Sequence, residues 1–426
     1  MANPYKRLCI YIALASITLT HATSDELLRM KLQDAVDAVQ QRLDIQGVSV
    51  AVVWNGQRYT PCAGLSYEDR PITDDMVLAI GSNTKTITSI VLLRMQEEGL
   101  LDLDDAVSMH LPPHPYINST ITIRQLLNHT SGLGEYAGGQ SYRDSVLANP
   151  RRIWKRDELF AMIPPAATAP GTAWAYCNTN YLVAGTIAEI VGGIPLHQLI
   201  ARYITTPLQR DSMRLFPQDS LVGELAHRWL GGRDASATPM MAEWSGAWAA
   251  GAVISTARQY AEFYHRLFTD GVLSSTSMSE FTAFVAPNSY GLGVRRLTVG
   301  GQIVYGHGGE IRGYTSSALW VPSLRASVVV LINEGPGTPA AIADTIVRVL
   351  ASHTTSVQES ADTESAFTYP ARVYDITGAY ITTVSSEEAL HEHAPGMYVC
   401  VAANNQRRTV QILGHRMIGI REIRRK

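Results

Sequence analysis

The chain has 426 residues, 46% of them hydrophobic and 17% charged, so it is long and apolar enough for one large domain with a smaller one beside it. Its formal net charge of −3 gives no electrostatic reason to expect nucleic acid or an anionic membrane surface as a partner. The four cysteines lie far apart, which excludes a disulfide framework, and no Cys/His spacing indicates a metal site.

The first 22 residues have the pattern of a secretory leader. The positive start MANPYKR precedes the apolar run LCIYIALASITLT, and Thr20-His21-Ala22 fits cleavage after Ala22. We therefore expect a signal peptide over residues 1–22 and a mature protein that is soluble and exported. The alternative is an uncleaved anchor, although the run is short for a bilayer.

A helix and a hairpin are predicted next. Apolar residues recur at helical spacing over residues 25–43, and residues 47–66 have the pattern of two strands around Asn55-Gly56, a strong turn signal. A long, almost wholly apolar helix is then predicted from Ser82, with Gly99 as its C-terminal cap. Such a helix is normally buried in the middle of a large domain.

The middle of the chain is predicted to be helical and its back part to return to strands. Short helical pieces lie within residues 112–180, longer helices are indicated over 180–206 and 255–268, and a closing helix over 340–351. The runs YGLGVRRLTV, QIVYGHGG, SSALWVP and ASVVVLINE have the composition of strands between them. We therefore predict an α+β fold in which both ends meet in one antiparallel sheet flanked by helices, with a mostly helical subdomain.

The composition changes after residue 352. The polar run HTTSVQESADTES predicts a linker over 353–366. Short alternating runs beyond it, ARVYDITGAYITTV, MYVCVAAN and RRTVQIL, predict a small all-β domain over 367–426. The first domain then covers residues 23–352.

Ser82 and Lys85 are three residues apart at the start of the predicted apolar helix, so they share one face. A serine nucleophile needs a base within hydrogen-bond reach, and burial disfavours the charged form of a lysine, which lets it act as that base. The helix start also aims a backbone N–H at a developing oxyanion. A lone Ser-x-x-Lys is weak evidence, however, because a serine at a helix start is usually a cap.

Two further segments offer polar groups for the same chemistry. Tyr176 and Asn178 are two apart in an extended stretch and point to one side, where a phenol could move a proton and an amide could orient a carbonyl. His307 precedes two glycines, Gly308 and Gly309, in a predicted strand, where the glycines would let a substrate backbone approach. Taken alone, each of these residues is more often structural.

Together, the three motifs resemble those of the penicillin-recognising serine hydrolases, which include class C beta-lactamases, serine D-alanyl-D-alanine carboxypeptidases, D-aminopeptidases and related esterases. Ser82-x-x-Lys85, Tyr176-x-Asn178 and His307-x-Gly309 stand in the family's order and at family-like separations. LLNHTSGL, PGTAWAYCNTNYLVAGTIAEIVGG and GAWAAGAVISTARQYAEF match secondary hallmarks of the family. The resemblance covers about residues 26–352.

The resemblance implies a role for each motif residue. Ser82 is acylated, while Lys85 and Tyr176 handle its proton and that of the leaving group. Asn178 binds the substrate amide, and His307 adds polarity and contributes with Gly309 to substrate binding. The backbone N–H groups of Ser82 and Glu310 form the oxyanion hole. His129 and Ser131 resemble a structural element, and neither a metal nor another cofactor is expected.

Two positions depart from the pattern of many relatives. His307 stands where beta-lactamases carry lysine, and Glu310 stands where many relatives carry serine or threonine. An acid there would repel a substrate carboxylate unless it is paired, and Arg312 is close enough in sequence to pair with it. We expect a D-alanyl-D-alanine carboxypeptidase-type peptidase acting on small peptides such as those of the cell wall. The alternatives are an esterase or D-aminopeptidase of the same fold, and a penicillin-binding sensor that is acylated without turnover.

The C-terminal residues resemble the sorting domain of type IX secretion cargo. The matched pattern is a strand that ends in Asp-x-x-Gly, at residues 375–378, and Pro-Gly-x-Tyr at residues 395–398. The resemblance implies that the secretion machinery is a partner, through both leader and C-terminal domain, and that the protein reaches the cell surface or the medium. An ordinary β-sandwich appendage is the alternative.

Overall fold

The computed structural model describes residues 24–365, followed by 371–375, 380–384, 396–402, 407–413 and 416–420. The chain divides into two compact units, Met1–Leu350 and Ala351–Lys426. The predicted leader over residues 1–22 lies outside the described residues.

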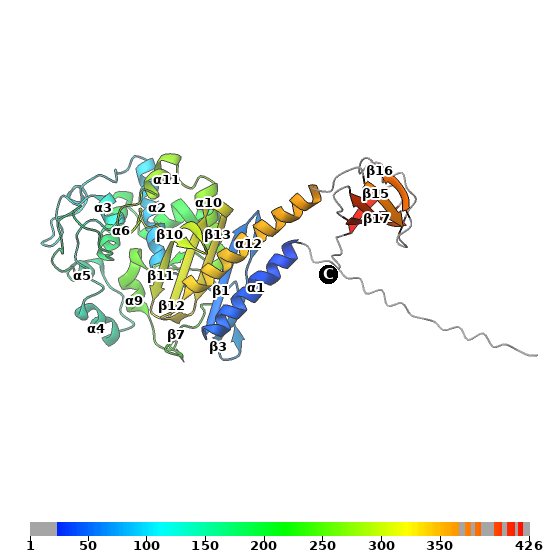
Figure 1. Cartoon of the computed structure of the whole chain (residues 1–426). Helices are drawn as coiled ribbons and strands as arrows, with labels where there is room; N and C mark the ends of the chain where they lie inside the picture. Colours follow the sequence, from blue (N-terminus) through cyan, green and yellow to red (C-terminus); the bar gives the residue numbers. More distant parts are fainter. Residues whose placement is uncertain are drawn as a thin grey trace, which may run out of the picture. The chain divides into compact units, whose positions relative to one another are not determined.

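Strands from the two ends of the first unit pair in one antiparallel sheet (Figure 1). In the register of β1 and β13, Val50 lies opposite Val330, so a strand near residue 50 is the neighbour of one near residue 330. The prediction that the two ends meet in one antiparallel sheet is confirmed. From one edge to the other, the strands are β10 (Arg295–Val299), β11 (Gln302–Ile311), β12 (Tyr314–Val321), β13 (Ala326–Ile332), β1 (Gly47–Trp54), β3 (Cys62–Tyr67) and β4 (Arg70–Pro71), with β2 (Gln57–Tyr59) also paired to β1.

One face of the sheet is covered by α1 (Ser24–Arg42) and by residues 339–350 of α12 (Pro339–Ser365), as Figure 1 shows. Leu32 of α1 and Ile346 of α12 are fully buried in one cluster with the sheet residues Val50 and Val330. Each helix contributes an apolar stripe and each strand an alternate set of valines, so the face excludes water.

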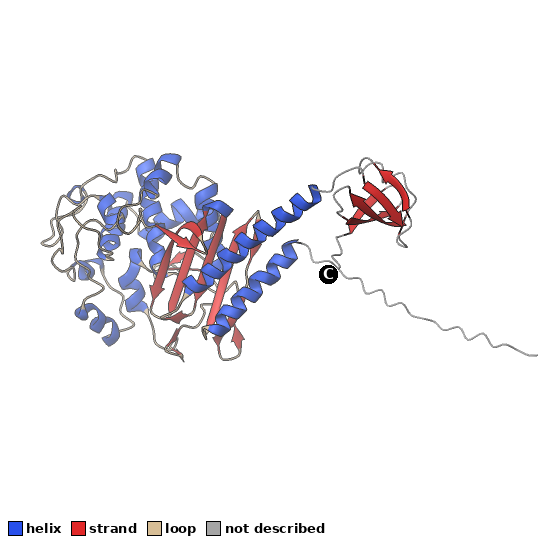
Figure 2. Cartoon of the chain, viewed as in Figure 1, coloured by secondary structure: helices blue, strands red, loops and turns tan. Residues whose placement is uncertain are grey.

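Helices fill the other side of the sheet and continue into a mostly helical region (Figure 2). At its centre lies α2 (Thr84–Glu97), preceded by the 3₁₀ turn η1 (Gly81–Asn83). The first ten residues of α2 are all buried, as the apolar composition of this segment predicts. The other helices are α3 (Ile123–Leu127), α4 (Gln140–Ala148), α5 (Arg156–Phe160), α6 (Thr179–Gly192), α7 (Leu196–Ile200), α8 (Thr206–Leu208), α9 (Met241–Ala247), α10 (Ala257–Thr269) and α11 (Ser275–Phe281).

Two predicted chain reversals are confirmed. Asn55 and Gly56 both have positive φ, 50° and 74°, which a two-residue hairpin turn requires, and they join β1 to β2. Gly99 has φ +69° directly after α2, as expected for a C-terminal cap glycine. The described part of the first unit also has two small three-stranded sheets. One consists of β5 (Leu78–Ala79), β9 (Val253–Ser255) and β6 (Arg214–Leu215), and the other of β14 (Glu334–Gly335), β7 (Trp229–Leu230) and β8 (Arg233–Asp234).

The segment predicted as a linker needs a correction. The structure continues α12 to Ser365, so residues 353–365 are helical. This stretch contains neither glycine nor proline, the two residues that interrupt helices most strongly, and it directly follows the apolar helix predicted over 340–351. Polarity alone therefore did not separate a linker from the continuation of a helix.

The second unit contains a five-stranded antiparallel sheet of order β16-β15-β17-β18-β19. The strands are β15 (Ala371–Asp375), β16 (Tyr380–Val384), β17 (Gly396–Ala402), β18 (Arg407–Leu413) and β19 (Arg416–Ile420). The three predicted strand runs correspond to the first four, and β19 was not predicted.

No single helix in the described part of the chain is long and apolar enough to cross a membrane. Only one bent pair, Thr179–Gly192 with Leu196–Leu208, passes the same test of length and composition.

Strand β11 lies directly against the turn that leads into α2. A Cβ atom on Gly309 would stand 2.0 Å from the carbonyl oxygen of Ile80 and 2.5 Å from Oγ of Ser316. The Ser316 hydroxyl donates to that same carbonyl at 2.7 Å. A Cβ on Gly81, whose φ is +52°, would likewise stand 2.5 Å from the backbone nitrogen of Glu310. These glycines allow two backbones to approach where any larger residue would separate them.

We predict that Gly309→Ala separates β11 from this turn, because the added methyl group has no space. The free energy of unfolding should fall by about 1–3 kcal/mol, as for other overpacked interiors. Hydrolytic activity should fall with it. Urea denaturation and an esterase assay measure the two effects.

Gly308→Ala is the matched control, because a Cβ there meets its nearest atom, the carbonyl oxygen of Ser316, only at 3.8 Å. Equal loss of stability in both variants would contradict the close-approach explanation.

Candidate active site

The ammonium group of Lys85 is the centre of the site. Its side chain is fully buried, and Nζ donates to Oγ of Ser82 at 3.0 Å, to Oδ1 of Asn178 at 2.8 Å and to the carbonyl oxygen of Ala250 at 2.8 Å. An ammonium group has three hydrogens, and each has an acceptor. Three segments that are far apart in sequence therefore converge on one side chain.

Ser82 lies in η1, one turn before Lys85, so the two side chains share a face as predicted. Its neighbours Gly81 and Asn83 are buried, whereas Ser82 itself is only partly buried. The hydroxyl thus combines access with a base 3.0 Å away. That distance permits direct proton transfer when the amine is neutral.

Side chains of α2 hold the segment that supplies the Ala250 carbonyl. Oγ1 of Thr88 donates to the carbonyl oxygen of Ala249 at 2.8 Å, and Oγ1 of Thr84 accepts from the backbone N–H of Val253 at 3.0 Å. These threonines lie on the same side of α2 as Lys85. Thr84 and Thr88 of this largely apolar helix therefore tie it to η4 (Trp248–Ala250) and β9.

Tyr176 and Asn178 reach the site from the stretch before α6. Asn178 is the residue that precedes this helix, and its side-chain oxygen bonds Lys85. The ring of Tyr176 lies with its centroid 4.9 Å from Nζ of Lys85 and 4.4 Å from the ring of His129. The structure thus brings Ser82, Lys85, Tyr176 and Asn178 together.

His307 lies on β11 and is buried, with its ring centroid 6.2 Å from that of Tyr176. Its Nε2 is 2.9 Å from the hydroxyl of Tyr290, and its Nδ1 bonds the carbonyl oxygen of Gly308. A carbonyl only accepts, so Nδ1 carries the hydrogen and Nε2 accepts from the phenol. Both ring nitrogens are thus occupied within the protein.

Burial lowers the pKa of His307 to about 3, and the nearby charge of Lys85 acts in the same direction. The imidazole is therefore neutral at ordinary pH. It adds no positive charge at the position where beta-lactamases carry lysine, and it has no free nitrogen to offer a substrate in this arrangement. The sequence did not identify Tyr290, which lies 17 residues before its partner.

His129 holds the stretch that carries Tyr176. Its Nδ1 accepts from the backbone N–H of Cys177 at 3.2 Å and from the side-chain amide of Asn180 at 2.9 Å. The Ser131 hydroxyl donates to the oxygen of the same amide. Burial places the pKa of His129 well below its usual value, so it acts here as a neutral acceptor. Cys177 is buried, and burial raises the pKa of its thiol to about 11, which fits the expectation that it only packs.

Glu135 is a site residue that sequence reasoning missed. Its carboxylate accepts the backbone N–H of Asn178 and that of Ala137, the latter at 2.7 Å. It therefore lies next to the residue whose side chain bonds Lys85. The available signal was its position three residues after the NHTSG segment, residues 128–132, which by sequence resembles a structural element only.

The pairing of Glu310 with Arg312, which their spacing in sequence would allow, is not observed. Both side chains are exposed, and no ion pair between them occurs in the described part of the chain. Arg312 instead donates its backbone N–H to the carboxylate of Glu243 at 3.2 Å. Glu243 is half-buried, and the loss of water around its carboxyl group raises the pKa of that group. The backbone nitrogen of Glu310 does lie against Gly81, beside Ser82, as an oxyanion hole requires.

Arg295 is a second charged residue near Tyr176 that the sequence did not predict. The guanidinium of Arg295, on β10, stands 5.8 Å from the ring centroids of Trp174 and Tyr176 and 5.3 Å from that of Tyr290. It thus places a cation over the aromatic wall beside Tyr176.

No group of three or more His, Cys, Asp or Glu side chains suited to a metal ion occurs among the described residues. The arrangement itself supplies a hydroxyl, an amine, a phenol and two backbone N–H groups. A hydroxyl beside an amine is the arrangement that activates a serine nucleophile.

The fold and these side chains define a class: serine hydrolases with an antiparallel sheet, a buried central helix and a Ser-x-x-Lys pair at its start. Residues 32–353 match the family model described as Beta-lactamase, and the chain belongs to that family. It is a serine hydrolase of the fold shared by beta-lactamases and penicillin-binding proteins.

The relatives that match this chain carry two kinds of name. The chain is 28% identical over 325 residues to a D-aminopeptidase of Brucella canis, covering 73% of this chain and 61% of the relative, so it spans about three fifths of that protein's length. It is 26% identical over 334 residues to penicillin-binding protein 4 of Amycolatopsis lactamdurans, covering 72% and 85%. The solved structure of a D-stereospecific amidohydrolase from Streptomyces sp. superposes with a TM-score of 0.65 at 28% identity, covering 75% of this chain and 97% of that one.

We predict that His307 makes stability depend on pH. Its pKa is about 3 in the folded protein and 6.5 ordinarily, so the unfolded chain takes up the proton first as the pH falls below 6.5. The contribution of neutral His307 to the free energy of unfolding is therefore fully present above pH 6.5. It is lost as the pH falls from 6.5 toward 3. The expected slope is at most about 1.4 kcal/mol per pH unit for one histidine.

His307→Gln should remove the contribution of His307 to the slope of the free energy of unfolding against pH. Urea denaturation at pH 8 gives the baseline cost of the substitution, and the same measurement at pH 6 and 5 gives the slope. A variant whose stability falls with pH as steeply as that of the wild type would show that His307 is not held neutral.

Proposed function

We propose that this protein cleaves a peptide or amide bond through an acyl-enzyme formed on Ser82. Neutral Lys85 accepts the Ser82 proton while Oγ attacks the carbonyl carbon, and the backbone N–H groups of Ser82 and Glu310 stabilise the oxyanion. Tyr176 and Lys85 return the proton to the leaving nitrogen as the C–N bond breaks. Water then attacks the ester carbonyl, releases the acid and restores the Ser82 hydroxyl.

The substrate that the site supports best is a short D-aminoacyl peptide or amide with a free amino group. The observation that carries this proposal is Glu135, a carboxylate hydrogen-bonded to the backbone of Asn178. A substrate whose carbonyl is oriented by Asn178 would bring an adjacent ammonium group toward that carboxylate, and such charge-assisted hydrogen bonds are strong. The exposed Glu310 on the neighbouring strand adds a second negative charge. The D configuration rests on the relatives named D-aminopeptidase and D-stereospecific amidohydrolase.

Arg295 favours a second candidate, a D-alanyl-D-alanine carboxypeptidase. Its guanidinium stands beside Tyr176, on the strand adjacent to β11, and forms no ion pair in the described part of the chain. A substrate ending in a free carboxylate on the leaving-group side would find its counter-charge there. The two candidates differ in which end of the substrate must be charged.

A matched substrate panel separates them. We predict that D-alanine p-nitroanilide is cleaved and that its N-acetyl derivative is cleaved at least about tenfold more slowly, because the acetyl group removes the ammonium charge. Ser82→Ala should lower kcat by about 10³-fold or more on every substrate. Glu135→Gln should slow only the free amine, and Glu68→Gln, at an exposed turn, serves as the control variant.

Equal rates on both anilides, unchanged by Glu135→Gln, would contradict the requirement for an amine. Release of D-alanine from an N-acylated D-alanyl-D-alanine peptide, abolished by Arg295→Gln, would then establish the carboxypeptidase. Full activity of Ser82→Ala would exclude both.

We also propose that residues 1–22 and 367–426 direct the protein out of the cell, on the strength of the leader pattern and the C-terminal motifs in the sequence. A chain that ends at residue 352 should be retained in the periplasm of a host with the type IX system, whereas the full chain should reach the surface or medium. Cell fractionation measures this. Equal distribution of the two chains would contradict a sorting role.

A further inference from the structure

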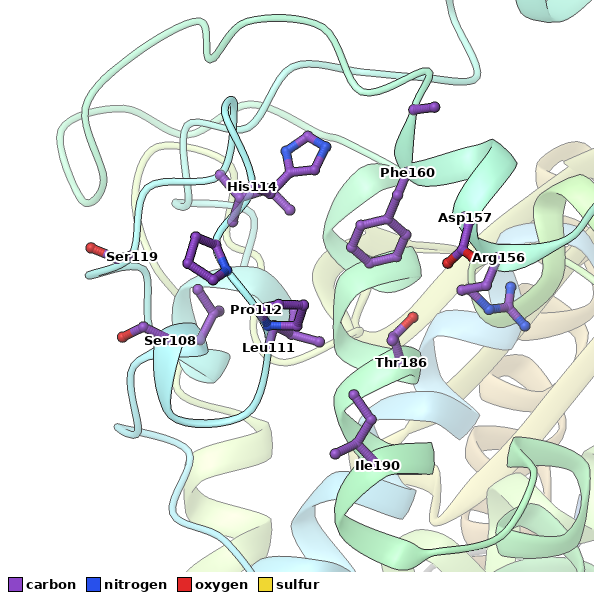
Figure 3. A pocket seen from close by; sticks show the side chains of 14 residues that line it. Ser108, Leu111, Pro112, His114, Ser119, Arg156, Asp157, Phe160, Thr186 and Ile190 are labelled. Atoms are coloured by element: carbon purple, nitrogen blue, oxygen red, sulfur yellow. The ribbon is translucent and has the colours of Figure 1, made fainter.

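A cavity of about 770 Å³ opens on the helical side of the first unit (Figure 3). Its walls are the segment 107–119 and the helices α5 and α6. The volume is within the range of small-molecule sites in proteins. None of its lining residues is among Ser82, Lys85, Tyr176, Asn178 and His307, so it is separate from the candidate active site.

The walls of this cavity are apolar. Figure 3 shows Phe160 and Ile190 on one side and Leu111 and Pro112 on the other. The ring of His114 lies edge-on to that of Phe160, with centroids 6.1 Å apart. Ile190 is 51% exposed although it is a large apolar residue, so the cavity leaves apolar surface in contact with water. Burying that surface against a ligand would be favourable.

One end of the cavity offers hydrogen-bond acceptors. Asp157 has an exposed carboxylate that forms no hydrogen bond or ion pair within residues 24–365. Thr186 uses its hydroxyl hydrogen on the carbonyl oxygen of Leu182 at 2.8 Å, which leaves its lone pairs free. Figure 3 shows both side chains on the same wall.

The positively charged residue at this end, Arg156, already contacts other side chains of the protein. The guanidinium of Arg156 stacks on the ring of Trp248, 3.1 Å from its centroid, and lies 4.0 Å from the carboxylate of Glu189. Arg156 and Asp157 both line the cavity, and of these two Asp157 is the one whose charged group has no ion pair or ring contact within residues 24–365. A ligand with a hydrogen-bond donor, and not one with a carboxylate, complements the end of the cavity formed by Asp157 and Thr186.

We propose that this cavity binds a small apolar molecule that carries one primary ammonium group. The apolar body lies between Phe160, Ile190 and Leu111, and the ammonium group donates to Asp157 and Thr186. The site is additional to the catalytic one and does not depend on the reaction proposed for it.

Calorimetric titration with 3-phenylpropylamine tests this proposal, with 3-phenylpropanol and 3-phenylpropionate as neutral and anionic probes of the same body. The amine should bind more tightly than the alcohol, and the acid most weakly. Asp157→Asn should weaken the amine about fivefold, the scale of one exposed charge pair, and leave the alcohol unchanged. Ile190→Ser should weaken both.

Two control variants make the result specific. Asp69→Asn removes an exposed acid elsewhere and should change nothing. Glu135→Gln removes the carboxylate at the candidate active site, and binding in the cavity should survive it. Thermal unfolding verifies that each variant is folded.

The proposal is overturned if Asp157→Asn and Ile190→Ser both leave the affinity for the amine unchanged. It is also overturned if the acid binds as tightly as the amine, or if Glu135→Gln abolishes all binding, since the amine would then occupy only the catalytic pocket.

Discussion

A buried ammonium group with three uncharged acceptors is the constraint on which the rest of the site depends. Lys85 has no contact with solvent, and an ammonium group without partners would be too costly to bury. Its three acceptors, Ser82, Asn178 and Ala250, come from three parts of the chain, so the fold must bring η1, the start of α6 and η4 to one point. The amine donates all three of these hydrogen bonds, so the same contacts that allow Lys85 to be buried also hold its Nζ beside Oγ of Ser82.

Three further side chains determine the charge around this lysine. His307, at the position of a second cation in many relatives, is neutral because it is buried beside Lys85 and bonded to Tyr290. Glu135 adds a carboxylate next to Asn178, while Arg295 adds a guanidinium beside Tyr176. The site therefore has a carboxylate next to Asn178, a guanidinium beside Tyr176 and a neutral imidazole at position 307.

Sequence patterns predicted those parts of the site that depend on local geometry. Ser82 and Lys85 could be placed on one helical face because their spacing fixes it, and Tyr176 and Asn178 on one side of an extended stretch for the same reason. The α+β fold followed from strand patterns at both ends and helical patterns between. Glu135, Tyr290 and Ala250 could not be found in this way, because each acts through a backbone group or a partner 17 to 165 residues away. Gly309 was predicted from the sequence as a site residue because a glycine lets a substrate backbone approach. In the structure its lack of a side chain also allows close contact with the backbone of Ile80.

The Ala250 carbonyl is held by a backbone that is itself strained. Trp248, two residues earlier, has φ 36° and ψ −119°, a region that bulky residues rarely adopt and that costs about 1–3 kcal/mol. Such a conformation persists only when packing determines it, and here the indole lies against Gly185 of α6, where even a Cβ atom would come within 2.9 Å of the ring. On another side the ring carries the guanidinium of Arg156. The acceptor of the catalytic amine is thus positioned by a tryptophan clamped between α6 and α5, the two helices that also form a wall of the apolar cavity. Helices α5 and α6 therefore contribute both to the packing around Trp248 and to the wall of the cavity.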